Sequence, residues 1–347
     1  MKARLEAQVM DARLRSVLLA IVENYIETVE PVGSRTLSKM LDLGLSSATI
    51  RNVMADLTEQ GYLEQPHTSA GRVPTNRAYR FYVEQGGGEG LLPEEVKRVV
   101  ERTLSESASG LMNLLSCTSR LLSELTQLTS VVASPRVSKT RLRLIEFLRI
   151  SDHRIYAVLI TQSNMVYHKI IEVSEDLAQD FLNSVSRYLN EQFARKPLEE
   201  MRQQVQDRLM DEKETYDQLL AHAVRLSKKA LDLSDEREVY VEGLSSILRE
   251  FGDLNRIREL LVLLEQKNAL VERMDASLQP GGVHIAIGME NGHQGWNDCS
   301  LVTASYSYAD NVLGAIGVIG PTRMNYRRVI PIVNYTARAL SQAIMEQ

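Results

Sequence analysis

Two adjacent side chains, Arg51 and Asn52, carry hydrogen-bonding groups that match the edges of DNA bases. An arginine guanidinium pairs in a bidentate manner with guanine in the major groove, and an asparagine amide does the same with adenine. Small polar residues, Ser47 and Thr49, precede this pair, and Ala55 follows it. Because such a surface fits a major groove, the stretch predicts direct reading of base sequence.

A second group of candidate DNA contacts lies just downstream. His67, Ser69 and Arg72 surround a predicted tight turn, and Arg77 follows it. Residues 68–82 contain three arginines and no acidic residue. A hairpin tip with only positive charge suits contacts to phosphate or to the minor groove, which position a protein on DNA without specifying sequence.

The apolar residues around these side chains predict a helix followed by a hairpin. Positions i, i+3, i+4 and i+7 are filled by Ile50, Val53, Met54 and Leu57, which form one apolar helix face. Ser46 or Ser47 can cap this helix, and Gly61 can end it. Strands at 62–65 and 72–75 would then form a wing beside the helix.

Two further helices are expected upstream of the helix that carries Arg51 and Asn52, which is the predicted reading helix. The first spans residues 11–28, and the second begins at Ser34 and turns at Gly44 into the reading helix, as in a helix-turn-helix unit. The start of the second helix, at Ser34 and Arg35, is suited to hold a phosphate. The alternative is a helix and hairpin that serve protein contacts.

Four motifs resemble the HrcA family of bacterial heat-inducible transcription repressors. They are PVGSRTL (31–37), SSATIRN (46–52), QPHTSAGRVPT (65–75) and IGPTRMNY (319–326). The resemblance implies a homodimer that binds double-stranded DNA at the inverted-repeat operator CIRCE, upstream of chaperone operons. It also implies that the chaperonin GroE keeps the repressor active. Val53 and Thr58 depart from the family pattern, because acidic residues are expected there.

The expected fold class is α+β, with an N-terminal winged helix-turn-helix and an antiparallel sheet further along. Strands are predicted at 142–150, 154–161, 165–173, 283–289, 300–308 and 312–320. The resemblance implies a GAF-like α/β domain interrupted by a mainly helical dimerisation domain. The expected boundaries are 1–85 for the winged helix, 86–105 for a Gly-rich linker, 106–194 and 278–347 for the GAF-like domain, and 195–277 for the insert.

Length and charge set limits on these expectations. The 347 residues carry a formal net charge of -5, so DNA binding must rest on local charge. Residues 1–85 contain ten Lys and Arg and ten Asp and Glu, which leaves this part neutral. No apolar run approaches the length of a membrane span, which predicts a cytoplasmic protein without a membrane partner.

No pattern of catalytic or metal-binding residues is found. The six histidines are scattered without metal-ligand spacing, so no metal, no cofactor and no enzymatic activity are expected. Gly314, Gly317 and Gly320 are read as a strand with close backbone contacts rather than as a nucleotide loop. The alternative function is a small-molecule-responsive winged-helix regulator, with its effector in the GAF-like domain.

Overall fold

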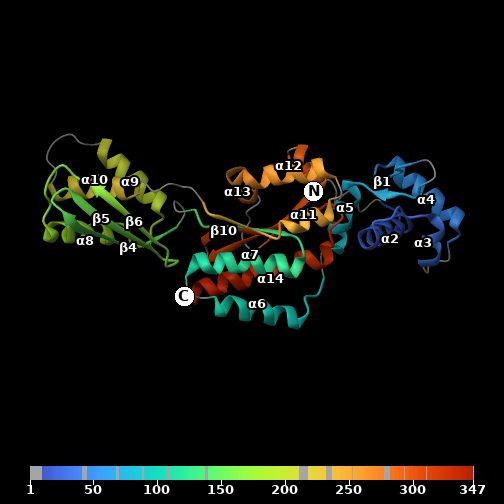
Figure 1. Ribbon diagram of the computed structural model, residues 1–347, viewed down its shortest axis with the longest axis horizontal. Helices are drawn as coiled ribbons and strands as arrows, with labels where there is room; N and C mark the ends of the chain where they lie inside the picture. The colour runs from blue at the N-terminus through green and yellow to red at the C-terminus, as the bar shows by residue number, and fades with distance from the viewer. Residues whose placement is uncertain are drawn as a thin grey trace.

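The computed structural model describes residues 10–40, 45–67, 70–87, 90–107, 110–136, 140–210, 218–231, 237–251, 253–276, 282–292, 294–309 and 311–346. Within them the chain folds into helices and three antiparallel sheets (Figure 1). We refer to the N-terminal module (10–87), the central domain (90–136 and 237–346) and the inserted lobe (140–231). No helix of this described part is long and apolar enough to cross a bilayer.

The N-terminal module consists of helices around a small hairpin. Its elements are α2 (Ala12–Thr28), α3 (Ser34–Met40), α4 (Ser47–Glu59), β1 (Leu63–Glu64), β2 (Val73–Pro74), α5 (Asn76–Tyr82) and the π-helical turn η1 (Val83–Gly87). The predicted apolar face of α4 is buried against α2 and α3, and Ile50 and Leu57 are fully buried. The two helices predicted for the helix-turn-helix unit correspond to α3 and α4, and the turn predicted at Gly44 lies outside the described residues.

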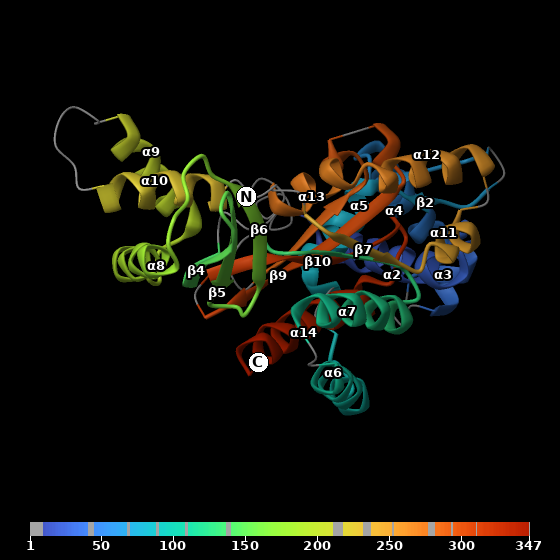
Figure 2. The same ribbon diagram turned by 60° about the vertical axis from the view of Figure 1, so that its left-hand side comes forward.

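The central domain is a five-stranded sheet with helices on both faces (Figure 2). Its strand order is β7-β3-β10-β9-β8, formed by β7 (Val239–Glu242), β3 (Thr129–Ala133), β10 (Asn311–Pro321), β9 (Cys299–Tyr308) and β8 (Val283–Ile287). One face packs on α7 (Leu111–Thr126) and α14 (Tyr326–Met345), and α6 (Glu94–Glu106) lies on the outer side of these two helices. The other packs on α11 (Ser245–Glu250), α12 (Leu254–Glu265) and α13 (Lys267–Ala276). Short 3-10 turns η3 (Gly288–Asn291) and η4 (Gln294–Trp296) join β8 to β9.

The glycines of β10 allow close backbone contacts, which confirms the sequence interpretation. A Cβ added at Gly317 would lie 2.7 Å from the Val302 carbonyl oxygen, and one at Gly314 would lie 2.8 Å from the Ala133 carbonyl oxygen. Both neighbours belong to the strands on either side of β10. Larger residues would therefore push the central strand away from its partners.

The inserted lobe has its own sheet and its own core. Strands β4 (Leu142–Ser151), β5 (Arg154–Thr161) and β6 (Val166–Glu172) pair in that order, and α8 (Gln179–Phe193), α9 (Leu198–Met210) and α10 (Gln218–Leu231) cover one face. Most buried apolar residues of this lobe form one cluster of their own. Met165 belongs instead to the cluster shared by the N-terminal module and the central domain, and Tyr167 packs against both clusters.

These boundaries differ from the predicted ones. We expected strands 142–173 in the GAF-like domain and an insert at 195–277, whereas the insert comprises the strands β4 to β6 together with α8 to α10. Residues 239–276 belong to the central domain, because β7 pairs with β3 and α12 and α13 cover the sheet. Alternation of apolar residues predicts that a strand has a buried face, but not which helices cover it.

The predicted linker at 86–105 is mostly structured. Its second half is helix α6, which buries Val100 and Leu104 and lies beside α14. A Cβ added at Gly90 would lie 2.0 Å from the Arg327 carbonyl oxygen. Gly90 therefore permits a close backbone approach to the start of α14, and does not act as a free spacer.

The N-terminal module is fixed to the central domain by α5. Arg80 forms a salt bridge with Glu290 and donates a 2.6 Å hydrogen bond to the Ile285 carbonyl oxygen. The Tyr79 and Tyr326 rings lie 6.3 Å apart, and burial raises the pKa of the Tyr79 hydroxyl, which stays neutral. A single apolar cluster includes buried residues of the N-terminal module and of the central domain. The junction is therefore a packed interface.

Candidate nucleic-acid interface

Helix α4 exposes the face that was predicted to read bases. Ala48, Arg51, Asn52 and Ala55 are exposed at i, i+3, i+4 and i+7, opposite the buried apolar face. Ser46 caps the helix, because its Oγ accepts a 3.1 Å hydrogen bond from the Thr49 backbone N–H. The helix thus presents one arginine and one amide between two alanines. Ala48 was not among the predicted contacts, although the same helical period would have identified it.

Three of the predicted polar contacts, Ser34, Ser47 and Thr49, form hydrogen bonds at the starts of α3 and α4. The Ser34 and Ser47 hydroxyl oxygens lie 3.1 Å apart, and Ser34 is only 9% exposed. The Thr49 hydroxyl lies 2.9 Å from Ser46 Oγ. The contact between Ser34 and Ser47 holds the start of α3 against the start of α4, whereas the contact between Thr49 and Ser46 lies within the cap of α4. The phosphate contact at Ser34 stays a prediction. Arg35, beside it on α3, is exposed.

The hairpin is attached to the turn before α3. Val32 and Arg72 exchange two backbone hydrogen bonds of 2.9 Å, which adds a third short strand beside β1 and β2. A Cβ added at Gly71 would lie 2.4 Å from the Val32 carbonyl oxygen. Only glycine permits this approach without moving backbone, so Gly71 sets the position of the hairpin.

Replacing Gly71 with alanine should destabilise the N-terminal module by about 1–3 kcal/mol, the usual cost of overpacking. Thermal unfolding with circular dichroism measures this change. The matched control is Gly33→Ala, because the nearest atom to its added Cβ is 3.9 Å away. Equal stability of the two variants would show that the hairpin does not depend on this contact.

Arg72 joins the hairpin to helix α4. Its Nε donates a 3.0 Å hydrogen bond to Thr58 Oγ1, and Thr58 in turn donates to the Met54 carbonyl oxygen. Since Thr58 is neutral, it orients the guanidinium without cancelling its charge. Within the part of the chain that the structure describes, no carboxylate forms an ion pair with Arg72. The sequence had marked Thr58 as a departure, but not as the partner of Arg72.

Arg77 lies apart from the other predicted contacts. Its Nη1 donates a 2.7 Å hydrogen bond to the carbonyl of Gln60, the C-terminal cap of α4, and its guanidinium carbon lies 4.5 Å from the centre of the Tyr62 ring. This places Arg77 at the end of α4 remote from Ser47, where it closes the helix. His67 is exposed at the hairpin, and Ser69 lies outside the described residues.

Two packed helices, α3 and α4, with an exposed arginine and amide on the second, are typical of DNA-binding transcription regulators. Residues 112–330 match the family model for the HrcA protein C terminal domain. The chain is 40% identical over 341 residues to the heat-inducible transcription repressor HrcA of Syntrophobacter fumaroxidans, which covers 97% of this chain and 98% of the relative. It is 41% identical over 334 residues to that of Geobacter sulfurreducens, covering 96% and 97%. The chain therefore belongs to the HrcA family of heat-inducible transcription repressors.

A solved structure shares the fold. It is a hypothetical protein whose crystal structure was determined at 2.2 Å resolution, with a TM-score of 0.64 and 24% sequence identity. The similarity covers 97% of this chain and 99% of that chain, so it includes the N-terminal module, the central domain and the inserted lobe.

Proposed function

We propose that this protein represses chaperone operons in the cytoplasm by binding the inverted repeat CIRCE as a homodimer. In this proposal the N-terminal module is a winged helix, and α4 enters the major groove of each half-site. The observation that supports it is the exposed stripe of Ala48, Arg51, Asn52 and Ala55. An arginine and an asparagine on such a stripe suit contacts to guanine and adenine. The central domain is the GAF-like domain of the family.

The inserted lobe supplies the dimer contact in this proposal. Its sheet is covered by helices on one face, while the other face carries exposed apolar side chains. The most exposed are Val166 (59%), Ile150 (51%), Leu148 (46%) and Ile170 (46%). Strand register aligns Leu148, Tyr156 and Ile170 in one row across this face.

A second copy of the chain is the occupant that best fits this apolar sheet face. Exposed apolar patches of this kind mark interaction sites. Two identical faces can cover each other about a twofold axis, and such a dimer matches the symmetry of an inverted repeat. The predicted dimerising region is thereby reassigned from 195–277 to the lobe at 140–231, with β4 to β6 forming the contact.

Chaperonin dependence follows from how the cores are divided. Most buried apolar residues of the inserted lobe form a cluster of their own, which meets the other cluster only through Met165 and Tyr167 among the described residues. In this proposal the lobe therefore unfolds before the rest of the chain. A partly unfolded lobe exposes apolar surface, and repression tracks the concentration of folded dimer. In this proposal GroE restores that dimer, and heat removes GroE by supplying competing clients.

Operator binding after heating and cooling should rise when GroE and ATP are added, and fall again when a denatured competitor protein is added. Fluorescence anisotropy with labelled operator measures the recovered fraction. The control is the same protein without heating, whose binding should not change. Complete recovery without chaperonin would contradict the proposal.

A further inference from the structure

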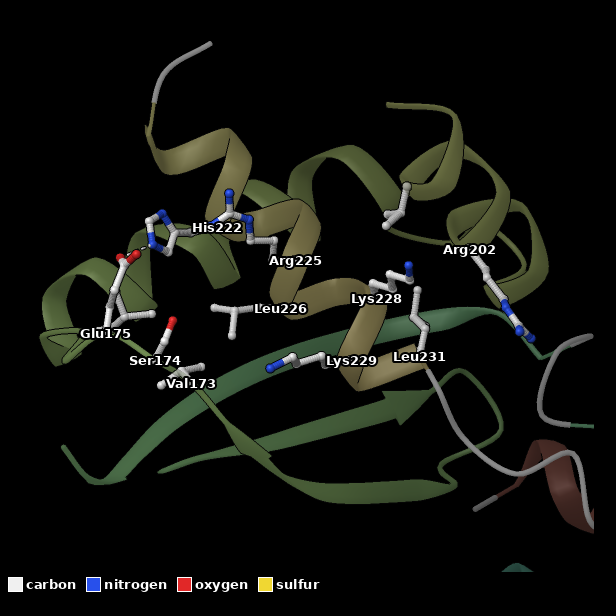
Figure 3. A pocket seen from close by; sticks show the side chains of 12 residues that line it. Val173, Ser174, Glu175, Arg202, His222, Arg225, Leu226, Lys228, Lys229 and Leu231 are labelled. Atoms are coloured by element: carbon white, nitrogen blue, oxygen red, sulfur yellow. Dashed lines mark hydrogen bonds and ion pairs between the residues drawn. The ribbon is translucent and has the colours of Figure 1, made fainter. Parts of the chain in front are cut away.

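A cleft of about 540 Å³ opens in the inserted lobe, on the helical side of its sheet (Figure 3). It lies between the segment that follows β6 and helices α9 and α10. His222, Leu226 and Lys229 project from one side of α10 towards residues 173–175 (Figure 3). The volume is in the range of sites that bind small molecules.

The floor of the cleft is aliphatic. Val205, Leu226 and Leu231 line it and are 1%, 2% and 7% exposed, so they form a fixed surface within the core of the lobe. Among the described residues that line the cleft, the imidazole of His222 is the only ring. Nucleobases are usually held by aromatic stacking. The floor therefore favours an alkyl chain over a nucleotide.

The rim of the cleft is strongly basic. Four permanent cations line it, Arg202, Arg225, Lys228 and Lys229, against one carboxylate, that of Glu175. Glu175 is engaged by His222, whose Nε2 lies 2.9 Å from its Oε2. Among the residues that the structure describes, Arg202, Arg225 and Lys228 form no ion pair. The rim is therefore locally positive, although the whole chain has a formal net charge of -5.

We propose that this cleft binds a single-chain anionic amphiphile of the fatty-acid class. The carboxylate head meets the guanidinium of Arg225 and the ammonium of Lys228 at the rim. The alkyl chain lies along the floor formed by Val205, Leu226 and Leu231, and the apolar surface removed from water is mainly that of the chain itself. The ligand would bridge α9, α10 and the segment after β6, so its binding would stabilise the folded lobe by mass action.

Decanoate, used below its micelle concentration, is the probe. Titration calorimetry on the full-length protein should show saturable binding that weakens as salt rises. Decanol has the chain without the charge and acetate has the charge without the chain, so both should bind at least about tenfold more weakly. Decanol binding as tight as decanoate would overturn the proposal.

Variants locate the binding site. Arg225→Ala and Lys228→Ala should each weaken decanoate binding about tenfold, since each removes a charged hydrogen-bond donor. Arg187→Ala is the matched control, because Arg187 is an exposed arginine on α8 that does not line the cleft. Ser174→Trp should abolish binding by filling the cleft from an exposed position. Unchanged affinity in Ser174→Trp, or equal losses in all three charge variants, would place decanoate elsewhere and overturn the proposal.

Discussion

Arg51→Ala should weaken binding to the CIRCE operator by about 1–3 kcal/mol for each half-site and relax specificity at one base pair. Binding to a random duplex should change little. The reason is that Arg51 is exposed beside Asn52 on the stripe of α4 that faces away from the core. Anisotropy titrations against both duplexes at several salt concentrations measure the two effects separately.

Two further variants serve as references for Arg51. Arg72→Ala should weaken binding to both duplexes and lower the salt slope by about 1, because Arg72 carries an uncompensated charge on the hairpin. Arg13→Ala, at an exposed arginine of α2, controls for the loss of a charge from the N-terminal module. Equal losses on operator and random duplex for Arg51→Ala would show that it does not read a base.

Ile170→Glu should convert the proposed dimer into monomers and reduce operator affinity by a factor of about 10²–10⁴. Ile170 is 46% exposed on the edge strand β6, where it continues the row of Leu148 and Tyr156, so a carboxylate there stays solvated in the monomer. In the dimer the same group would be buried against its copy. Sedimentation velocity gives the oligomeric state, and anisotropy gives the affinity.

The control for this variant is Arg187→Glu, which adds a carboxylate to the same lobe on the exposed side of α8. It should leave the dimer intact. If the Ile170→Glu variant is still a dimer, the exposed sheet face does not form the dimer contact, which must then lie on another surface.

Local patterns in the sequence predicted helix α4, its apolar face and its cap. The four apolar positions of α4 and the cap at Ser46 both follow from residues within one or two turns of each other. The insert boundaries were not predictable in the same way. Strands β3 and β7 are separated by more than a hundred residues, and their pairing depends on the whole lobe between them closing on itself.

The candidate site also combines features that neighbouring residues predict with features that depend on contacts between distant residues. Exposure of Arg51 and Asn52 follows from helical period alone. The bond between Arg72 and Thr58, and the packing of Arg77 on Tyr62, depend on how the hairpin folds back on α4. An arginine in a basic stretch is therefore ambiguous in sequence, since it can contact phosphate or close a helix.

The shared core between α5 and the central domain has a consequence for how this family diversifies. Tyr79 and Tyr82 on one side pack in the same apolar cluster as Met324 and Tyr326 on the other. Exchange of the whole reading module between paralogues would leave two mismatched apolar surfaces at this seam. If α4 reads the operator as proposed, changes of operator sequence should be matched by single substitutions on the exposed stripe of α4. Exchange of the whole N-terminal module between relatives should be rare.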